Sequence, residues 1–180
     1  MTRFISSTGI VMGKRDYKDR DLILTIFTST HGKLSLLARG AKRSFKRFGG
    51  KLDLLYYLSI IIEPSTKFWS IREVSLIDSF PNITCDLKRL SCACHFVDIV
   101  RKSLLDGQVN EQLFELLKKA LFALNDQPSS RISKIQTRFY NYYLVSEGIK
   151  HENSILNYEQ FKGLFESYTG VGLNRMYSLR

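Results

Sequence analysis

Cysteine and long apolar runs are scarce in this 180-residue chain, and each scarcity excludes a class of protein. The three cysteines, at positions 85, 92 and 94, are odd in number and gathered in one segment. They argue against a disulfide framework and favour a reduced, cytoplasmic protein. The first residues contain no apolar run of the signal-peptide kind. No segment approaches the roughly 18–20 apolar residues that a membrane span requires, so we expect no membrane partner.

Sequence motifs of common enzyme classes are also missing. The chain has no phosphate-binding loop, nucleophile elbow or HExxH sequence, so we expect no enzyme and no cofactor. One carboxylate cluster, Asp16, Asp19 and Asp21, leaves a metal-dependent nuclease open as an alternative. Four neighbouring cations would oppose a divalent ion there, and turns favour aspartate anyway. The sequence therefore favours a turn over a metal site.

The segment Cys92-Ala-Cys94-His95, with Cys85 nearby, invites a zinc interpretation. On a helix, residues two apart point about 200° away from each other, so Cys92 and Cys94 cannot both bind one ion. A buried cysteine that packs as a small apolar residue is the preferred interpretation. We therefore expect no metal.

Positive charge is abundant and uneven. The formal net charge is +10 and the isoelectric point about 9.6, which favours a polyanionic partner, either nucleic acid or an anionic membrane surface. Residues 1–80 carry 14 lysines and arginines against 7 acids, whereas residues 81–180 carry 13 against 10. The first segment is therefore the better candidate for contact with a polyanion.

Residues 22–52 contain no acid at all, although Asp21 and Asp53 flank them. Within this stretch, a glycine-bounded loop over 39–50 carries two pairs of basic residues, with Phe45 and Phe48 close behind them. Mobile cations suit a phosphate backbone and flat rings suit unstacked bases, so the pattern predicts contact with nucleic acid. The alternatives are a solvated loop kept basic for solubility and, for Phe48, a ring folded back onto the rest of the domain.

The first hairpin loop adds further cations, interleaved with the three aspartates. Trp69, on the fifth predicted strand, suits either a base-stacking site or the core, and the core is the commoner place for a lone strand tryptophan. The predicted DNA-binding residues are Lys14, Arg15, Lys33, Arg39, Lys42, Arg43, Phe45, Lys46, Arg47, Phe48 and Lys51.

The first 80 residues have the pattern of strands. Five runs rich in β-branched, aromatic and leucine residues are separated by turn chemistry; they cover residues 4–14, 22–28, 33–39, 52–63 and 67–78. Apolar alternation changes phase in the fifth run, and a bulge near Arg72-Glu73 would reconcile the two halves. Five strands in so short a segment predict a small closed or nearly closed barrel.

After Pro81 the apolar period becomes helical. Stripes run over residues 87–104, 113–124, 132–143 and 158–168, and Asn110 and Gly148 are suited to begin one helix and end another. The predicted fold class is therefore α+β, with a nucleic-acid-binding barrel over 1–80 and an α-helical domain over 81–180.

Several short segments resemble, in order and spacing, the start of the bacterial recombination mediator family RecO. They are residues 9–17 (GIVMGKRDY), 21–28 (DLILTIFT), 31–42 (HGKLSLLARGAK), 47–50 (RFGG), 74–81 (VSLIDSFP) and 86–90 (DLKRL). The resemblance implies that the barrel is of the oligonucleotide-binding (OB) type. An OB-type RNA-binding or ribosome-associated factor stays open as an alternative, because the same charge would serve it.

The RecO resemblance also implies function. Members of that family bind single-stranded and double-stranded DNA, anneal complementary strands, and act with RecR and the single-stranded DNA-binding protein (SSB) to load recombinase. A cytoplasmic, nucleoid-associated location follows from the same resemblance. Many members carry a four-cysteine zinc module after the third helix, whereas residues 148–157 here contain no cysteine. We therefore expect a short form that lacks this module.

The resemblance suggests a second partner surface on the helical domain. SSB ends in an acidic, hydrophobic tail, which requires apolar pockets beside cations. Candidate cations beside the second and third helical stripes are Lys118, Lys119, Arg131, Lys134 and Arg138. The alternative is that these cations merely solvate the outer faces of the helices.

Overall fold

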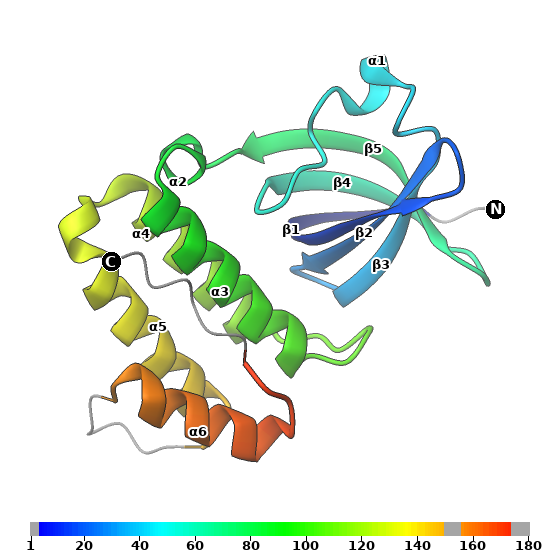
Figure 1. The fold of residues 1–180 in the computed structure, drawn as a ribbon. Helices are drawn as coiled ribbons and strands as arrows, with labels where there is room; N and C mark the ends of the chain where they lie inside the picture. The colour runs from blue at the N-terminus through cyan, green and yellow to red at the C-terminus, as the bar shows by residue number, and fades with distance from the viewer. Residues whose placement is uncertain (1–3, 150–155, 174–180) are drawn as a thin grey trace. The chain divides into compact units, whose positions relative to one another are not determined.

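The computed structural model describes residues 4–149 and 156–173, without the side chains of Phe45 and Lys46 (Figure 1). Residues 150–155 and 174–180 lie outside this description, and with them most of the cysteine-free stretch 148–157. The chain divides into two compact units. One contains residues 1–79 together with 104–111, and the other contains residues 80–103 and 112–180.

The first unit is built on a five-stranded closed barrel. Its strands are β1 (Ile5–Tyr17), β2 (Asp21–Thr28), β3 (Gly32–Ala38), β4 (Tyr57–Glu63) and β5 (Trp69–Asp78). They close in the order β1-β2-β3-β5-β4, and all pairs are antiparallel except a short parallel contact of β3 with β5. Strand number, closure and order confirm the predicted OB-type barrel.

Alternating apolar residues fill the barrel. On β4, Leu58, Ile60 and Ile62 are fully buried, whereas the residues between them are half-buried. Leu24 and Ile26 of β2 belong to the same core. This period of two is the pattern that a strand with one face inward requires.

Two strand boundaries differ from the sequence prediction. β1 runs on to Tyr17, so Lys14 and Arg15 pair with Leu24 and Ile23 of β2 and do not lie in the hairpin loop. β4 begins at Tyr57 and not at position 52, because the preceding residues are held in a loop where the Leu55 N–H donates to Val11 O at 2.9 Å. Both differences arise from pairing with distant strands, which local turn chemistry does not encode.

The predicted bulge in β5 is confirmed. Ile61 of β4 pairs with Glu73 and Ile62 pairs with Ile71, so Arg72 is the extra residue. A bulge locally disrupts the hydrogen-bond ladder and leaves backbone groups unpaired. The carbonyls at this bulge accept hydrogen bonds from Arg47, as described below.

Residues 104–111 follow the helix α3 (Leu87–Ser103) in sequence but belong to the barrel unit. Gly107 N–H donates to Lys33 O at 2.7 Å, and the Lys33 ammonium donates to Leu104 O at 2.5 Å. Gly32 lies beneath this segment with φ +69°, and a Cβ there would come within 2.0 Å of Gln108 O. The close approach therefore requires glycine at position 32.

The second unit is helical, as predicted. It contains α2 (Pro81–Thr84), α3, α4 (Glu111–Asp126), a 3-10 turn at Ser129–Arg131, α5 (Ile132–Ser146) and α6 (Tyr158–Thr169). Its core is aromatic: Phe96 stacks on Phe139 with centroids 4.0 Å apart, and Tyr140 stacks on Phe161 at 4.1 Å. In the part of the chain that the structure describes, no helix is long and apolar enough to cross a membrane.

Candidate nucleic-acid interface

Two basic segments that are separate in sequence meet at one end of the barrel (Figure 1). Gly40 N–H donates to Asp21 Oδ1 at 2.8 Å, and Lys42 N–H donates to Arg20 O at 3.1 Å. These backbone hydrogen bonds attach residues 39–44 to the tip of the β1–β2 hairpin. We call the combined set of cations the hairpin–loop surface; it comprises Arg15, Lys18, Arg20, Arg39, Lys42 and Arg43.

Four arginines of this surface are exposed. Arg15, Arg20, Arg39 and Arg43 make no side-chain hydrogen bond or ion pair with any residue of the described structure. Lys51, half-buried at the far end of the loop, is likewise without such a partner among described residues. Solvated cations of this kind can approach a phosphate without first breaking an internal contact.

Two predicted lysines are paired with acids, but only loosely. The Lys14 ammonium lies 2.5 Å from Asp53 Oδ1, and the Lys42 ammonium lies 3.0 Å from Asp16 Oδ2. The aspartates are about half and four-fifths exposed, respectively. Exposed pairs contribute about 0–1 kcal/mol, so a phosphate can compete with either acid.

Arg47 has a structural role that the sequence did not reveal. Its guanidinium donates to Ile71 O at 2.6 Å and to Arg72 O at 2.7 Å, the carbonyls at the β5 bulge, and lies over the Phe48 ring at 4.8 Å. It therefore attaches the short helix α1 (Phe45–Phe48) to β5. The expectation that Arg47 is free to contact DNA does not fit this arrangement.

Phe48 is buried in the barrel core and only 2% exposed. The predicted base-stacking role is therefore wrong for Phe48 in this conformation, and the alternative of a ring folded back onto the barrel holds. Gly49, with φ 36°, ends α1 directly after Phe48 and turns the chain away. The side chains of Phe45 and Lys46, which were predicted to contact DNA, lie outside the described residues.

Lys33 is also less available than the sequence suggested. Its side chain is only 13% exposed, and its ammonium lies 3.4 Å from Asp106 Oδ1 besides donating to Leu104 O. The physical reason is the return of residues 104–111 to β3. Lys33 therefore fixes this segment to the barrel and is a poor candidate for direct phosphate contact.

The carboxylates of the nuclease alternative do not form a metal site in the structure. Asp16 faces Lys42 and Asp21 accepts the Gly40 N–H, so these two serve the hairpin–loop contact. Across residues 4–149 and 156–173, no group of three histidine, cysteine or acidic side chains could hold an ion.

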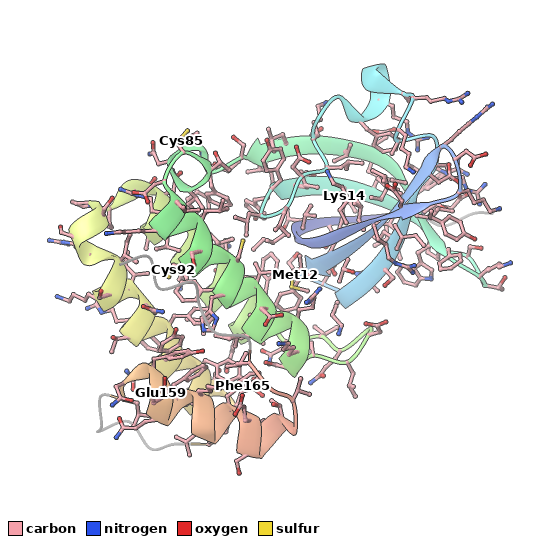
Figure 2. All side chains as sticks on the ribbon, viewed as in Figure 1. Met12, Lys14, Cys85, Cys92, Glu159 and Phe165 are labelled. Carbon is pink, nitrogen blue, oxygen red and sulfur yellow. The ribbon has the colours of Figure 1, made fainter. Side chains whose placement is uncertain are left out.

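The cysteines occupy different environments, as Figure 2 shows for two of them. Cys85 is exposed at the end of α2, Cys94 is half-buried, and Cys92 is buried on α3. Burial raises the pKa of the Cys92 thiol to about 12. A thiol with so high a pKa stays protonated and unreactive at neutral pH, in keeping with its predicted role as a small apolar residue.

Several residues suited to base contact were left out of the predicted set. Tyr17 and Phe68 have ring centroids 5.7 Å apart, the Lys18 ammonium lies 5.5 Å from the Tyr17 ring, and His31 meets Trp69 edge-on at 5.9 Å. Trp69 is partly buried against the barrel core. The sequence signal for this grouping is the adjacent pair Phe68-Trp69 at the start of β5, and a pair in the sequence does not show which residues its rings contact.

Comparison with known proteins identifies the family. The family model described as "Recombination protein O N terminal" matches residues 1–80, and the one described as "Recombination protein O C terminal" matches residues 85–147. The chain belongs to the RecO family. The two matches fall on the barrel and on the helices, as the resemblance of the short segments implied.

Relatives named "DNA repair protein RecO" are similar over most of this chain. The protein from Anaeromyxobacter sp. (strain K) is 34% identical over 126 residues, which are 69% of this chain and 50% of that protein. The protein from Geobacter sulfurreducens is 35% identical over 130 residues, 71% and 54% of the two chains. The protein from Desulfatibacillum aliphaticivorans is 29% identical over 148 residues, 81% and 57%. The matched part thus spans about half the length of these RecO relatives.

Proposed function

We propose that this RecO-family chain is a non-catalytic DNA-binding protein of recombinational repair, and that the hairpin–loop surface is its principal contact with the phosphate backbone. The observation that carries the proposal is the pair of hydrogen bonds from Gly40 and Lys42 to the β1–β2 hairpin. They hold the two segments together, and both segments carry exposed arginines that have no side-chain partner among the described residues. The names of the relatives supply DNA repair as the setting.

The chemistry of this surface suits backbone contact without base specificity. Arginine binds phosphate through a planar fork of donors, and a sheet-bound hairpin presents such side chains from a fixed backbone. Neutralising phosphates on two strands would lower their mutual repulsion and so favour annealing. Binding of single-stranded and duplex DNA, strand annealing and help in loading recombinase onto SSB-coated DNA are all part of the proposal.

RecR and the acidic tail of SSB are the proposed protein partners. In the helical unit Lys119, Lys134 and Arg138 are exposed, whereas Lys118 pairs with Glu115 at 2.5 Å. The exposed three are therefore the better candidates for the tail. Isothermal titration of the full chain with an acidic, hydrophobic tail peptide should give micromolar affinity, near −8 kcal/mol. If no binding heat is detected up to high micromolar peptide, SSB is not a partner of this chain.

A salt titration tests the DNA-binding surface. Each neutralised phosphate contributes a slope of about −0.7 in log K against log salt for single strands, so several contacts should give about −3 to −5. The triple variant Arg15→Glu, Arg39→Glu, Arg43→Glu should lose most binding and reduce the slope by about 2. A fluorescent oligonucleotide assay with single-stranded DNA, duplex DNA and RNA of one sequence measures this. It also separates DNA repair from the RNA-binding alternative, which tighter binding of RNA would favour.

The matched control reverses three exposed cations of the helical unit, Lys88→Glu, Lys119→Glu and Lys134→Glu. Both triple variants change the net charge equally, so a general effect of charge would weaken both. If the Arg15/Arg39/Arg43 variant is folded by circular dichroism and binds no more weakly than the control, the hairpin–loop surface is not the DNA contact.

A further inference from the structure

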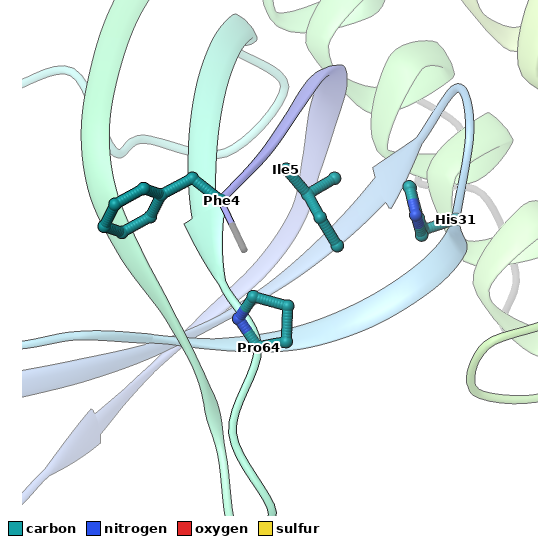
Figure 3. Close-up of a pocket in the computed structure, with 4 residues that line it drawn as sticks. All are labelled: Phe4, Ile5, His31 and Pro64. Atoms are coloured by element: carbon teal, nitrogen blue, oxygen red, sulfur yellow. The ribbon is translucent and has the colours of Figure 1, made fainter. Parts of the chain in front are cut away.

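A shallow pocket opens on the barrel unit at a place that the hairpin–loop surface does not include (Figure 3). Its volume is about 440 Å³, and it is lined by Phe4, Ile5, His31 and Pro64. These residues come from the start of β1, the β2–β3 turn and the residue after β4. Phe4 is 56% exposed, so its ring is accessible to a ligand.

The imidazole of His31 is held in place by its surroundings. Its Nδ1 lies 2.7 Å from Thr30 Oγ1, which in turn lies 2.8 Å from Ser7 Oγ on β1. The His31 backbone N–H donates to Thr28 Oγ1 at 3.0 Å, and the ring meets Trp69 edge-on. Within the described residues Nε2 makes no hydrogen bond, so it is left for a ligand.

The pocket combines what an unpaired nucleobase needs. Phe4 and Pro64 offer apolar surface for the flat face of a base, and His31 Nε2 offers a hydrogen-bonding atom for its edge. Stacking of this kind is tolerant of sequence, because every base has a π-face. The volume suits one nucleoside, at the lower end of the range for small-molecule sites.

Charge complementarity on the same unit favours a polyanion as the source of that base. Residues 1–80 carry 14 cations against 7 acids, and Lys67 is exposed in the connection between Pro64 and Trp69. In a duplex the bases are paired and stacked, and their faces cannot enter the pocket. A single strand presents an accessible base and a charged backbone at the same time.

We propose that the pocket formed by Phe4, Ile5, His31 and Pro64 receives one unpaired base of single-stranded DNA. The inference rests on the proposed DNA binding and adds a site that discriminates single strands from duplexes. The hairpin–loop surface binds backbone of either form, whereas this pocket binds only the single strand.

The test compares Phe4→Ala with the wild-type full chain on single-stranded and duplex oligonucleotides of one sequence. Loss of one base contact should weaken single-strand binding about 5- to 150-fold, with duplex binding unchanged within about twofold. Phe4→Trp keeps a stacking ring and should restore single-strand affinity. Tyr142→Ala, which removes a 64%-exposed aromatic ring of α5, is the matched control and should change neither affinity.

A second readout locates the base. Single strands carrying 2-aminopurine should lose fluorescence on binding the wild-type chain and Phe4→Trp, and lose less on binding Phe4→Ala. Unchanged single-strand affinity and quenching in Phe4→Ala, or equal weakening for single strands and duplexes, would overturn the pocket while leaving the DNA-binding proposal intact. If the wild-type chain binds neither form of DNA, both proposals fail together.

Discussion

The substitution Gly32→Ala tests how much the contact of residues 104–111 with the barrel contributes to stability. In Gly32→Ala the new Cβ would come within 2.0 Å of Gln108 O and 2.3 Å of Gln108 C, distances at which the backbone must move. The φ of +69° adds strain, because a side chain in the left-handed region costs about 1–2 kcal/mol. The contact between position 32 and Gln108 cannot be kept, and we expect residues 104–111 to shift off β3.

The cost of that shift follows from the hydrogen bonds it breaks. The bond from Gly107 N–H to Lys33 O contributes about 1 kcal/mol, and the charge-assisted bond from Lys33 to Leu104 O about 1.5–3 kcal/mol. Together with the backbone strain, Gly32→Ala should destabilise the barrel unit by about 3.5–6 kcal/mol.

Gly40 supplies the matched control. Its φ is +70°, but a Cβ there would meet nothing within 4 Å, so Gly40→Ala should cost only the strain of about 1–2 kcal/mol. Urea unfolding followed by tryptophan fluorescence measures both variants. The chain's one tryptophan, Trp69, lies on β5 and so reports on the barrel. If the two variants differ by less than about 0.5 kcal/mol, residues 104–111 are not bound to β3 in solution.

Two further perturbations probe contacts that only the structure reveals. Arg47→Met keeps most of the side-chain length but leaves the bulge carbonyls of Ile71 and Arg72 without their donor, so it should cost about 1–3 kcal/mol in urea unfolding; Arg43→Met should cost almost nothing, and equal effects would refute the anchoring role. Burial lowers the pKa of His95 to about 4, below its ordinary 6.5, because the ring lies among aromatic residues and Nε2 lacks a hydrogen bond in the described structure. The unfolded chain therefore binds the extra proton, stability is fully present above about pH 6.5, and about 3 kcal/mol is lost as the pH falls through 4. Thermal melts of His95→Phe should show a weaker decline between pH 6.5 and 5 than the wild type, and parallel declines would contradict this.

The barrel and the helices could be predicted from sequence because local patterns report them directly. Alternation in β4 and the phase change at Arg72 are visible in a single run of residues, and both are confirmed. The extension of β1 through Lys14 and Arg15 was missed because it depends on β2 continuing alongside. A helix of four residues, such as α1, is too short to show a period.

The sequence predicted which segments supply the cations of the candidate site, but not which of these cations are structural and which are exposed. Arg43 and Arg47 look alike in sequence, yet Arg47 meets the carbonyls at a bulge in β5 while Arg43 faces solvent. Lys33 is bound by Asp106 and Leu104, more than seventy positions away. Which cation is structural depends on such distant partners, so charge pattern alone cannot decide it.

The difference between structural and exposed cations bears on how the hairpin–loop surface could bind DNA. The bonds from Gly40 and Lys42 hold the backbone of the hairpin–loop surface, whereas Arg15, Arg39 and Arg43 are exposed and have no side-chain partner among the described residues. A fixed backbone with mobile cations suits phosphates whose spacing differs between single strands and duplexes, because each side chain can adjust by itself. The exposed pair of Lys42 with Asp16 adds a cation that a phosphate can recruit at small cost. A surface of this kind would not by itself distinguish single strands from duplexes; in our proposal the pocket at Phe4 and His31 makes that distinction.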